Sequence, residues 1–121
     1  MKKLHHIVTS LSKGKTRTLA ILNGVIGDTL EKNKSPLSLK MTLRSSDSPL
    51  TLTKRSLSQI PLSDHGKVCI LAHGSCGSDR GWNFRNDPST NYGSLLQKDH
   101  GYTPFYLSYN SGLHISKNGK Y

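Results

Sequence analysis

The residues best suited to chemistry lie at positions 73–77, where the sequence reads His-Gly-Ser-Cys-Gly. His73 and Ser75 are the residue types that act as base and nucleophile in enzymes, and Cys76 offers a thiol. Gly74 and Gly77 lack a Cβ, so they tolerate φ > 0 and let the main chain approach a ligand closely. The spacing therefore predicts a turn that binds a ligand.

The element that must position this turn is the apolar run before it. Residues 68–72 read Val-Cys-Ile-Leu-Ala, without polar alternation. Five residues are too few for a buried helix, so the run predicts a strand covered on both faces, as in the parallel sheets of α/β proteins. Ligands of open α/β sheets bind at the carboxyl ends of the strands, which is where the turn follows.

A strand, then His-Gly-x-x-Gly, then Trp82 resembles the oxyanion-hole strand and loop of the α/β-hydrolases, especially bacterial esterases and lipases. Further segments resemble other parts of one such subgroup, in the same order along the chain. These segments are 22–28, 41–44, 95–96, 99–104, 106–107 and 109–119. The resemblance covers residues 17–121 and implies the N-terminal portion of an α/β-hydrolase domain.

The resemblance implies a carboxylic-ester hydrolase that acts on a small-molecule or lipid ester, without a cofactor and without a metal. The backbone N–H of Ser75 would be the first oxyanion donor, and His73, Gly74 and Gly77 would support the loop. The loop after the next parallel strand emerges at the same edge of the sheet. The residues that this loop would bring near the site are Asn110, Ser111 and His114.

The nucleophile that this resemblance requires is missing. α/β-Hydrolases carry a serine in Gly-x-Ser-x-Gly, followed along the chain by an Asp or Glu and then a His. No Gly-x-Ser-x-Gly occurs in the 121 residues. Ser75 is the nearest candidate, but His73 is bulky where a small residue is needed, and residues 78–90 oppose the helix that must follow. We therefore expect an incomplete sheet whose nucleophile lies beyond Tyr121.

Two alternatives to a working esterase remain. One is a catalytically inactive, truncated relative of the α/β-hydrolases, and the other is a basic module that binds nucleic acid or an anionic surface. The basic binding module is considered because the formal net charge is +10, from 17 Lys and Arg against 7 Asp and Glu. The basic residues are scattered with few aromatic residues among them, so the sequence does not favour nucleic acid as a partner.

The two cysteines, Cys69 and Cys76, fit neither a zinc site nor a disulfide framework, and this mildly favours a reducing compartment. Polar residues interrupt the apolar stretch after Leu4, so the sequence predicts no signal peptide. It also predicts no transmembrane segment. We therefore expect a cytoplasmic protein.

The first third of the chain predicts a leader, a helix and a β-hairpin. Residues 1–16 are basic and unpatterned, which is typical of a mobile leader. Residues 17–32 predict a helix with one apolar face, and we expect close packing against another element to compensate for Gly24 and Gly27. Alternation over 37–44, a turn at 45–49 and a return at 50–53 predict the hairpin.

The rest of the chain predicts a parallel strand–helix–strand. A loop is expected over 54–66, before the central strand, and an irregular surface segment over 79–90. A short helix is predicted over 91–99 with Gly101 as its stop, followed by a strand over 104–109 parallel to the central one. The predicted fold class is α/β, the beginning of an α/β-hydrolase sheet.

Overall fold

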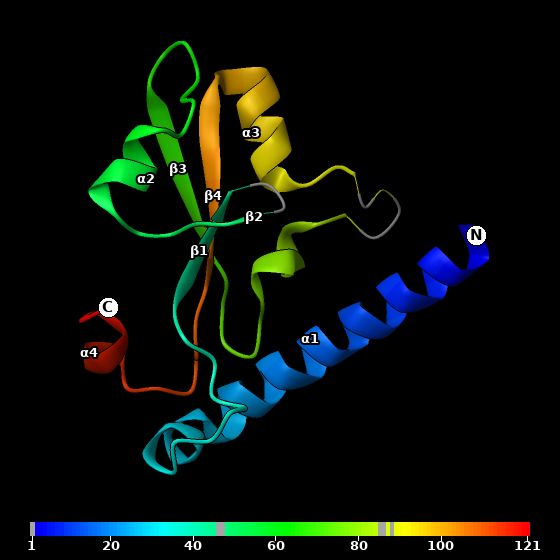
Figure 1. The fold of residues 1–121 in the computed structure, drawn as a ribbon, viewed down its shortest axis with the longest axis vertical. Helices are drawn as coiled ribbons and strands as arrows, with labels where there is room; N and C mark the ends of the chain where they lie inside the picture. Colours follow the sequence, from blue (N-terminus) through cyan, green and yellow to red (C-terminus); the bar gives the residue numbers. More distant parts are fainter. Residues whose placement is uncertain (1, 46–47, 85–86, 88) are drawn as a thin grey trace. The chain divides into compact units, whose positions relative to one another are not determined.

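The computed structural model describes residues 2–45, 48–84, 87 and 89–121 (Figure 1). The chain is a mixed α/β protein with a four-stranded open sheet. Its elements are, in order, α1 (Lys2–Lys32), β1 (Thr42–Ser45), β2 (Ser48–Pro49), α2 (Lys54–Ser58), β3 (Lys67–Ala72), the 3₁₀ turn η1 (Asp79–Trp82), α3 (Tyr92–His100), β4 (Tyr102–Ser108) and α4 (Ile115–Asn118).

The chain divides into two compact units, which we call the helical unit and the sheet unit. The helical unit consists of Met1–Lys40, Gly74–Ser78 and Tyr109–Tyr121. The sheet unit consists of Met41–His73 and Asp79–Ser108. Each unit is therefore built from segments that are distant in the sequence.

The sheet unit contains all four strands, in the order β2-β1-β4-β3. β3 and β4 are parallel, with Val68 opposite Thr103 and Leu71 opposite Tyr106. β1 is antiparallel to both β4 and β2. Helix α3 lies along β4 in Figure 1 and packs against it. The predicted α/β class is confirmed, and so is the parallel strand–helix–strand.

Helix α3 begins and ends where its local signals predict. Asn91 Oδ1 accepts the N–H of Ser94 at 2.9 Å, and Ser94 Oγ accepts the N–H of Asn91 at 3.0 Å, which completes a capping box. Gly101 ends the helix in the left-handed conformation, with φ 69°. Gly93 permits close packing, since a Cβ there would lie 2.9 Å from the Cβ of Pro104.

The prediction that the central strand, β3, is covered on both faces is wrong. Val68 is 45% exposed and Ile70 is 61% exposed, whereas Leu71 is only 8% exposed. Among the described residues β3 pairs with β4 alone, so it is an edge strand of the sheet. An apolar run does not show whether both faces of its strand are covered, because that depends on the elements that pack on the sheet.

A hairpin is present, but its return strand, β2, lies within the predicted turn, and residues 50–53, predicted as the return, form no strand. Positions 46 and 47 lie outside the described residues. The segment 37–40, part of the stretch predicted as strand, instead contacts α1 within the helical unit. Asn23 Nδ2 donates to the Leu37 carbonyl at 2.8 Å, and Asn23 Oδ1 accepts the N–H of Leu39 at 2.8 Å. Because the Leu37 carbonyl and the Leu39 N–H bond to Asn23, they do not take part in hydrogen bonds between strands.

The helices outside α3 differ from expectation. α1 ends at Lys32 as predicted, but it begins at Lys2 rather than near Arg17, and Ile26 interrupts it with φ −126° and ψ 21°. α2 forms within the expected loop and is capped by Thr53, whose Oγ1 accepts the N–H of Ser56 at 3.1 Å. No helix of the described chain is long and apolar enough to cross a membrane.

Candidate functional site

The turn that follows β3 is closed by its own backbone. The N–H of Gly77 donates to the carbonyl of Gly74 at 3.1 Å, and Cys76 has a φ of 58°. A positive φ at the third of four residues is the geometry of a type II turn, in which glycine is usual at that position. Here Cys76 takes the left-handed conformation instead of either glycine, at a cost of about 1–2 kcal/mol.

The backbone donors of this turn are not equivalent. The N–H of Cys76 donates to Ser111 Oγ at 3.0 Å, and the N–H of Gly77 is used within the turn. No described residue accepts a hydrogen bond from the N–H of Ser75. A Cβ added at Gly74 would meet nothing within 4 Å, so there is open space beside the turn. The N–H of Ser75 is therefore the donor of this turn that has no partner among the described residues.

Helix α1 supports the turn through a glycine. A Cβ at Gly24 would lie 2.9 Å from both the N and the Cα of Cys76, closer than such contacts occur in proteins. Gly27 is equally constrained, since its Cβ would lie 2.7 Å from Cγ of Asn110. The prediction that close packing compensates for these two helical glycines is confirmed. Ile26, the non-helical residue, lies between them.

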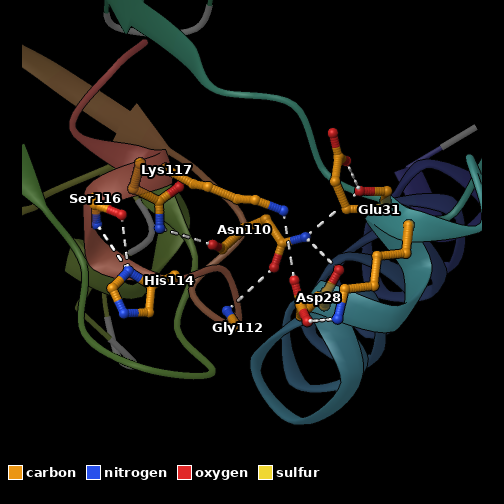
Figure 2. A network of polar contacts seen from close by, with 11 residues as sticks. Asp28, Glu31, Asn110, Gly112, His114, Ser116 and Lys117 are labelled. Atoms are coloured by element: carbon orange, nitrogen blue, oxygen red, sulfur yellow. Dashed lines mark hydrogen bonds and ion pairs between the residues drawn. The ribbon is translucent and has the colours of Figure 1, made fainter.

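Asn110 is the centre of the polar network that joins α1 to the C-terminal segment (Figure 2). It is only 1% exposed. Its Nδ2 donates to the Gly27 carbonyl at 3.1 Å and to Ser38 Oγ at 3.4 Å, and its Oδ1 accepts the N–H of Gly112 at 3.1 Å. Its hydrogen-bonding capacity is thus used inside the helical unit. Asn110 was predicted as a possible contact of the site, and in this structure its side chain holds the C-terminal segment on α1.

An ion pair of Asp28 connects α4 to α1. Asp28 Oδ1 lies 3.6 Å from Nζ of Lys117 in α4, and its Oδ2 lies 2.6 Å from Nζ of Lys32 (Figure 2). The hydrogen bond from Lys32 is the main cause that holds the pKa of Asp28 below its ordinary value of 3.8. The segment that carries Ser111 is therefore tied to α1 at Asp28 as well as at Asn110.

His114, the third predicted contact of the site, turns toward α4. Its Nδ1 lies 2.8 Å from Ser116 Oγ and accepts the N–H of Ser116 at 3.3 Å, so His114 caps α4 (Figure 2). The residue is exposed. Of the three residues predicted near the site, only Ser111 contacts the turn.

Family models, curated proteins and solved structures offer no match to this chain. Function must therefore be inferred from the residues and their geometry. Within the described residues, no group of three or more His, Cys, Asp or Glu side chains could hold a metal ion.

The residues that flank the turn in the sequence belong to the sheet unit. His73 ends the segment 41–73 of this unit and is 7% exposed. Trp82 packs edge-on against Tyr92, with ring centroids 6.1 Å apart. Phe84 also packs edge-on against Tyr92, with ring centroids 4.9 Å apart. This aromatic cluster anchors η1 to the start of α3.

The sheet unit contains an ion pair that sequence reasoning missed. Arg44 Nε lies 2.7 Å from Asp79 Oδ2, with both side chains 13% exposed, and the Arg44 guanidinium lies 4.5 Å from the ring centroid of Tyr106. Tyr106 in turn donates from its hydroxyl to Asn91 Oδ1. Arg44 alternates with apolar residues in the sequence, which predicts a solvated face and gives no sign of a partner 35 residues away.

Asn23 and Ser111 are the other residues whose roles the sequence concealed. Asn23 is fully buried and lies on the same side of α1 as the buried residues Ala20 and Gly27, whereas Val25 is 72% exposed. A buried asparagine must find partners, since a buried amide without hydrogen bonds is costly. Nothing in the sequence pairs Ser111 with Cys76.

Proposed function

We propose that this chain forms the oxyanion-binding part of a serine carboxylic-ester hydrolase of the α/β-hydrolase type. The observation that carries the proposal is the backbone N–H of Ser75. It has no acceptor among the described residues, while the N–H groups of Cys76 and Gly77 are both engaged. Ser75 is also the position that the hydrolase pattern assigns to the first oxyanion donor.

The arrangement fits acyl transfer because negative charge develops on the carbonyl oxygen when a nucleophile attacks an ester. A donor held by a closed turn needs no rearrangement as this charge forms. Loss of one such donor costs about 2.7–4 kcal/mol in the barrier. The donor belongs to the main chain, so the side chain at position 75 is not part of the chemistry.

The finer assignment to the α/β-hydrolases is supported by the position of the turn in the chain. The turn follows the carboxyl end of β3, which is parallel to β4, and ligands bind at this end of open α/β sheets. The chain has no Gly-x-Ser-x-Gly, so we place the serine, the acid and the general-base histidine outside these 121 residues. The substrate class is a small-molecule or lipid ester, and the mechanism needs neither cofactor nor metal.

The first test examines the gene product from its native host, recovered through a tag on the chromosomal gene. A fluorophosphonate probe should label a serine outside residues 1–121, and the product should hydrolyse p-nitrophenyl butyrate. Its intact mass, once the mass of the tag is subtracted, should exceed 13.3 kDa. A product of 13.3 kDa that neither reacts with the probe nor hydrolyses the ester would instead be the inactive relative.

The second test removes the proposed donor alone. Proline is favoured at the second position of a type II turn and has no N–H, so Ser75→Pro keeps the turn and deletes the donor. We expect kcat for p-nitrophenyl butyrate to fall about 10²–10³-fold. Ser75→Ala, the matched control, keeps the N–H and should retain the activity. Equal activity of both variants would exclude Ser75 as the donor.

A further inference from the structure

The hydrogen bond from the N–H of Cys76 to Ser111 Oγ, at 3.0 Å, holds one particular peptide plane. That N–H belongs to the peptide between Ser75 and Cys76, the central peptide of the turn. Type I and type II turns differ by a flip of this peptide, and the flip moves the third residue from negative to positive φ. The contact with Ser111 therefore acts on the bond that distinguishes the two turns.

The sequence of the turn by itself disfavours the observed conformer. Glycine is the residue that accepts positive φ without penalty, and the third position is Cys76, with φ 58°. Such a conformation persists only where the surrounding structure imposes it. Two contacts of Cys76 do so here: the hydrogen bond to Ser111, and the close approach of Gly24 to its backbone.

Ser111 is itself held in place. The preceding residue, Asn110, is fixed by α1 through the Gly27 carbonyl at 3.1 Å, and its own carbonyl accepts a hydrogen bond from Asn118 Nδ2 at 3.0 Å. The following residue, Gly112, approaches α1 so closely that a Cβ there would lie 2.9 Å from the N of Gly27. The acceptor is therefore presented to the turn by a segment packed on α1.

We infer that Ser111 is a positioning residue that holds the oxyanion turn in its type II conformer. This inference rests on the proposed function of the Ser75 donor. Ser111 engages the N–H of Cys76, leaves the N–H of Ser75 unengaged, and prevents the flip that would exchange the directions of the Ser75 carbonyl and the Cys76 N–H. A turn that populates both conformers is not preorganised for the developing charge.

The conformer itself can be read by NMR on the 121-residue chain, without any activity. In a type II turn the Ser75 Hα lies close to the amide hydrogen of Cys76, and in a type I turn it does not. The wild-type chain should show a strong cross-relaxation peak for this pair and slow exchange of the Cys76 amide hydrogen. Ser111→Ala should weaken the peak and speed the exchange, whereas Ser58→Ala, an exposed control, should change neither.

Two further comparisons separate positioning from general support. Ser111→Thr keeps the hydroxyl acceptor, whereas Ser111→Val has the shape of threonine without a hydroxyl. Of these two variants only Ser111→Thr should retain the cross-relaxation peak. This comparison remains informative if Ser111→Ala unfolds the chain. Glycine accepts positive φ without help, so in a Cys76→Gly background Ser111→Ala should have little effect. A wild-type peak in both Ser111→Ala and Ser111→Val would overturn the inference.

The activity readout uses the native gene product. Ser111→Ala should lower kcat about tenfold and leave KM unchanged, because small errors in the placement of a reacting group cost up to about a hundredfold. Ser111→Thr should restore kcat. If the gene product has no esterase activity, the proposed function fails while the NMR comparison still decides the role of Ser111. If esterase activity is present and Ser111→Ala leaves kcat unchanged, only the inference fails.

Discussion

Asn110 Nδ2 donates a 3.1 Å hydrogen bond to the carbonyl of Gly27, 83 residues earlier in the chain. The acceptor immediately follows Ile26, the non-helical residue of α1. A side chain that enters the helical hydrogen-bond ladder is a recognised cause of such kinks. One contact between α1 and the loop that carries Ser111 therefore lies directly beside the interruption of the helix.

Asn110→Ala is expected to destabilise the chain substantially. It leaves the Gly27 carbonyl and the Gly112 N–H without their partner, and each buried polar group left unpaired costs about 1–3 kcal/mol. The midpoint of urea unfolding, followed by circular dichroism, measures the loss. Asn33→Ala, an exposed control at the end of α1, should lie within about 0.5 kcal/mol of wild type. Equal midpoints for the two variants would contradict the role of Asn110.

Gly27→Ala and Gly14→Ala form a matched pair in α1. Alanine is a better helix former than glycine by about 1 kcal/mol, and a Cβ at Gly14 would meet nothing within 4 Å, so Gly14→Ala should raise the free energy of unfolding. At Gly27 the Cβ would lie 2.7 Å from Cγ of Asn110, and this overpacking should cost about 1–3 kcal/mol. Urea unfolding should therefore show a higher free energy of unfolding for Gly14→Ala and a lower one for Gly27→Ala. A gain in both variants would mean that Gly27 has room for a side chain.

The sequence predicted the elements whose signals are local. The capping box of Asn91 and Ser94 and the stop at Gly101 lie within or next to α3, so a short window of sequence contains them. The close packing of Gly24 and Gly27 was also predictable, because a glycine inside a helix is costly unless a near neighbour requires it. The apolar run of β3 and the glycine-rich turn after it belong to the same class of signal.

The sequence could not predict features set by distant partners. Val68 and Ile70 share one face of β3 and are exposed, whereas Leu71 on the other face is buried, and which face is covered depends on the elements packed on the sheet rather than on the strand. The resemblance placed Asn110 and His114 near the site, but hydrogen bonds to Gly27 and to Ser116 direct these side chains elsewhere. The left-handed conformation of Cys76 runs against its local preference and depends on tertiary contacts.

Asp79→Ala should destabilise the sheet unit by about 3 kcal/mol, because it leaves the largely buried guanidinium of Arg44 without its carboxylate. Arg44→Met combined with Asp79→Ala removes both charges and should recover part of that loss. Chemical unfolding of the two single variants and the double variant measures the coupling. Arg55→Met, at an exposed position of α2, is the control and should have little effect. If the loss of stability in the double variant equals the sum of the losses in the two single variants, Arg44 and Asp79 are not energetically coupled.

Asp28→Asn should reduce stability in a manner that depends on pH. The pKa of Asp28 is lowered in the folded state, chiefly by the hydrogen bond from Lys32, so the stabilisation is present above the ordinary value of 3.8. It is lost as the pH falls through the lower pKa of the folded state. Urea midpoints of wild type and Asp28→Asn should therefore differ slightly at neutral pH and converge once the pH falls below the lowered pKa of Asp28. Asp64→Asn, at an exposed position, is the control, and a constant difference between wild type and Asp28→Asn across this range would show that the charge of Asp28 does not contribute.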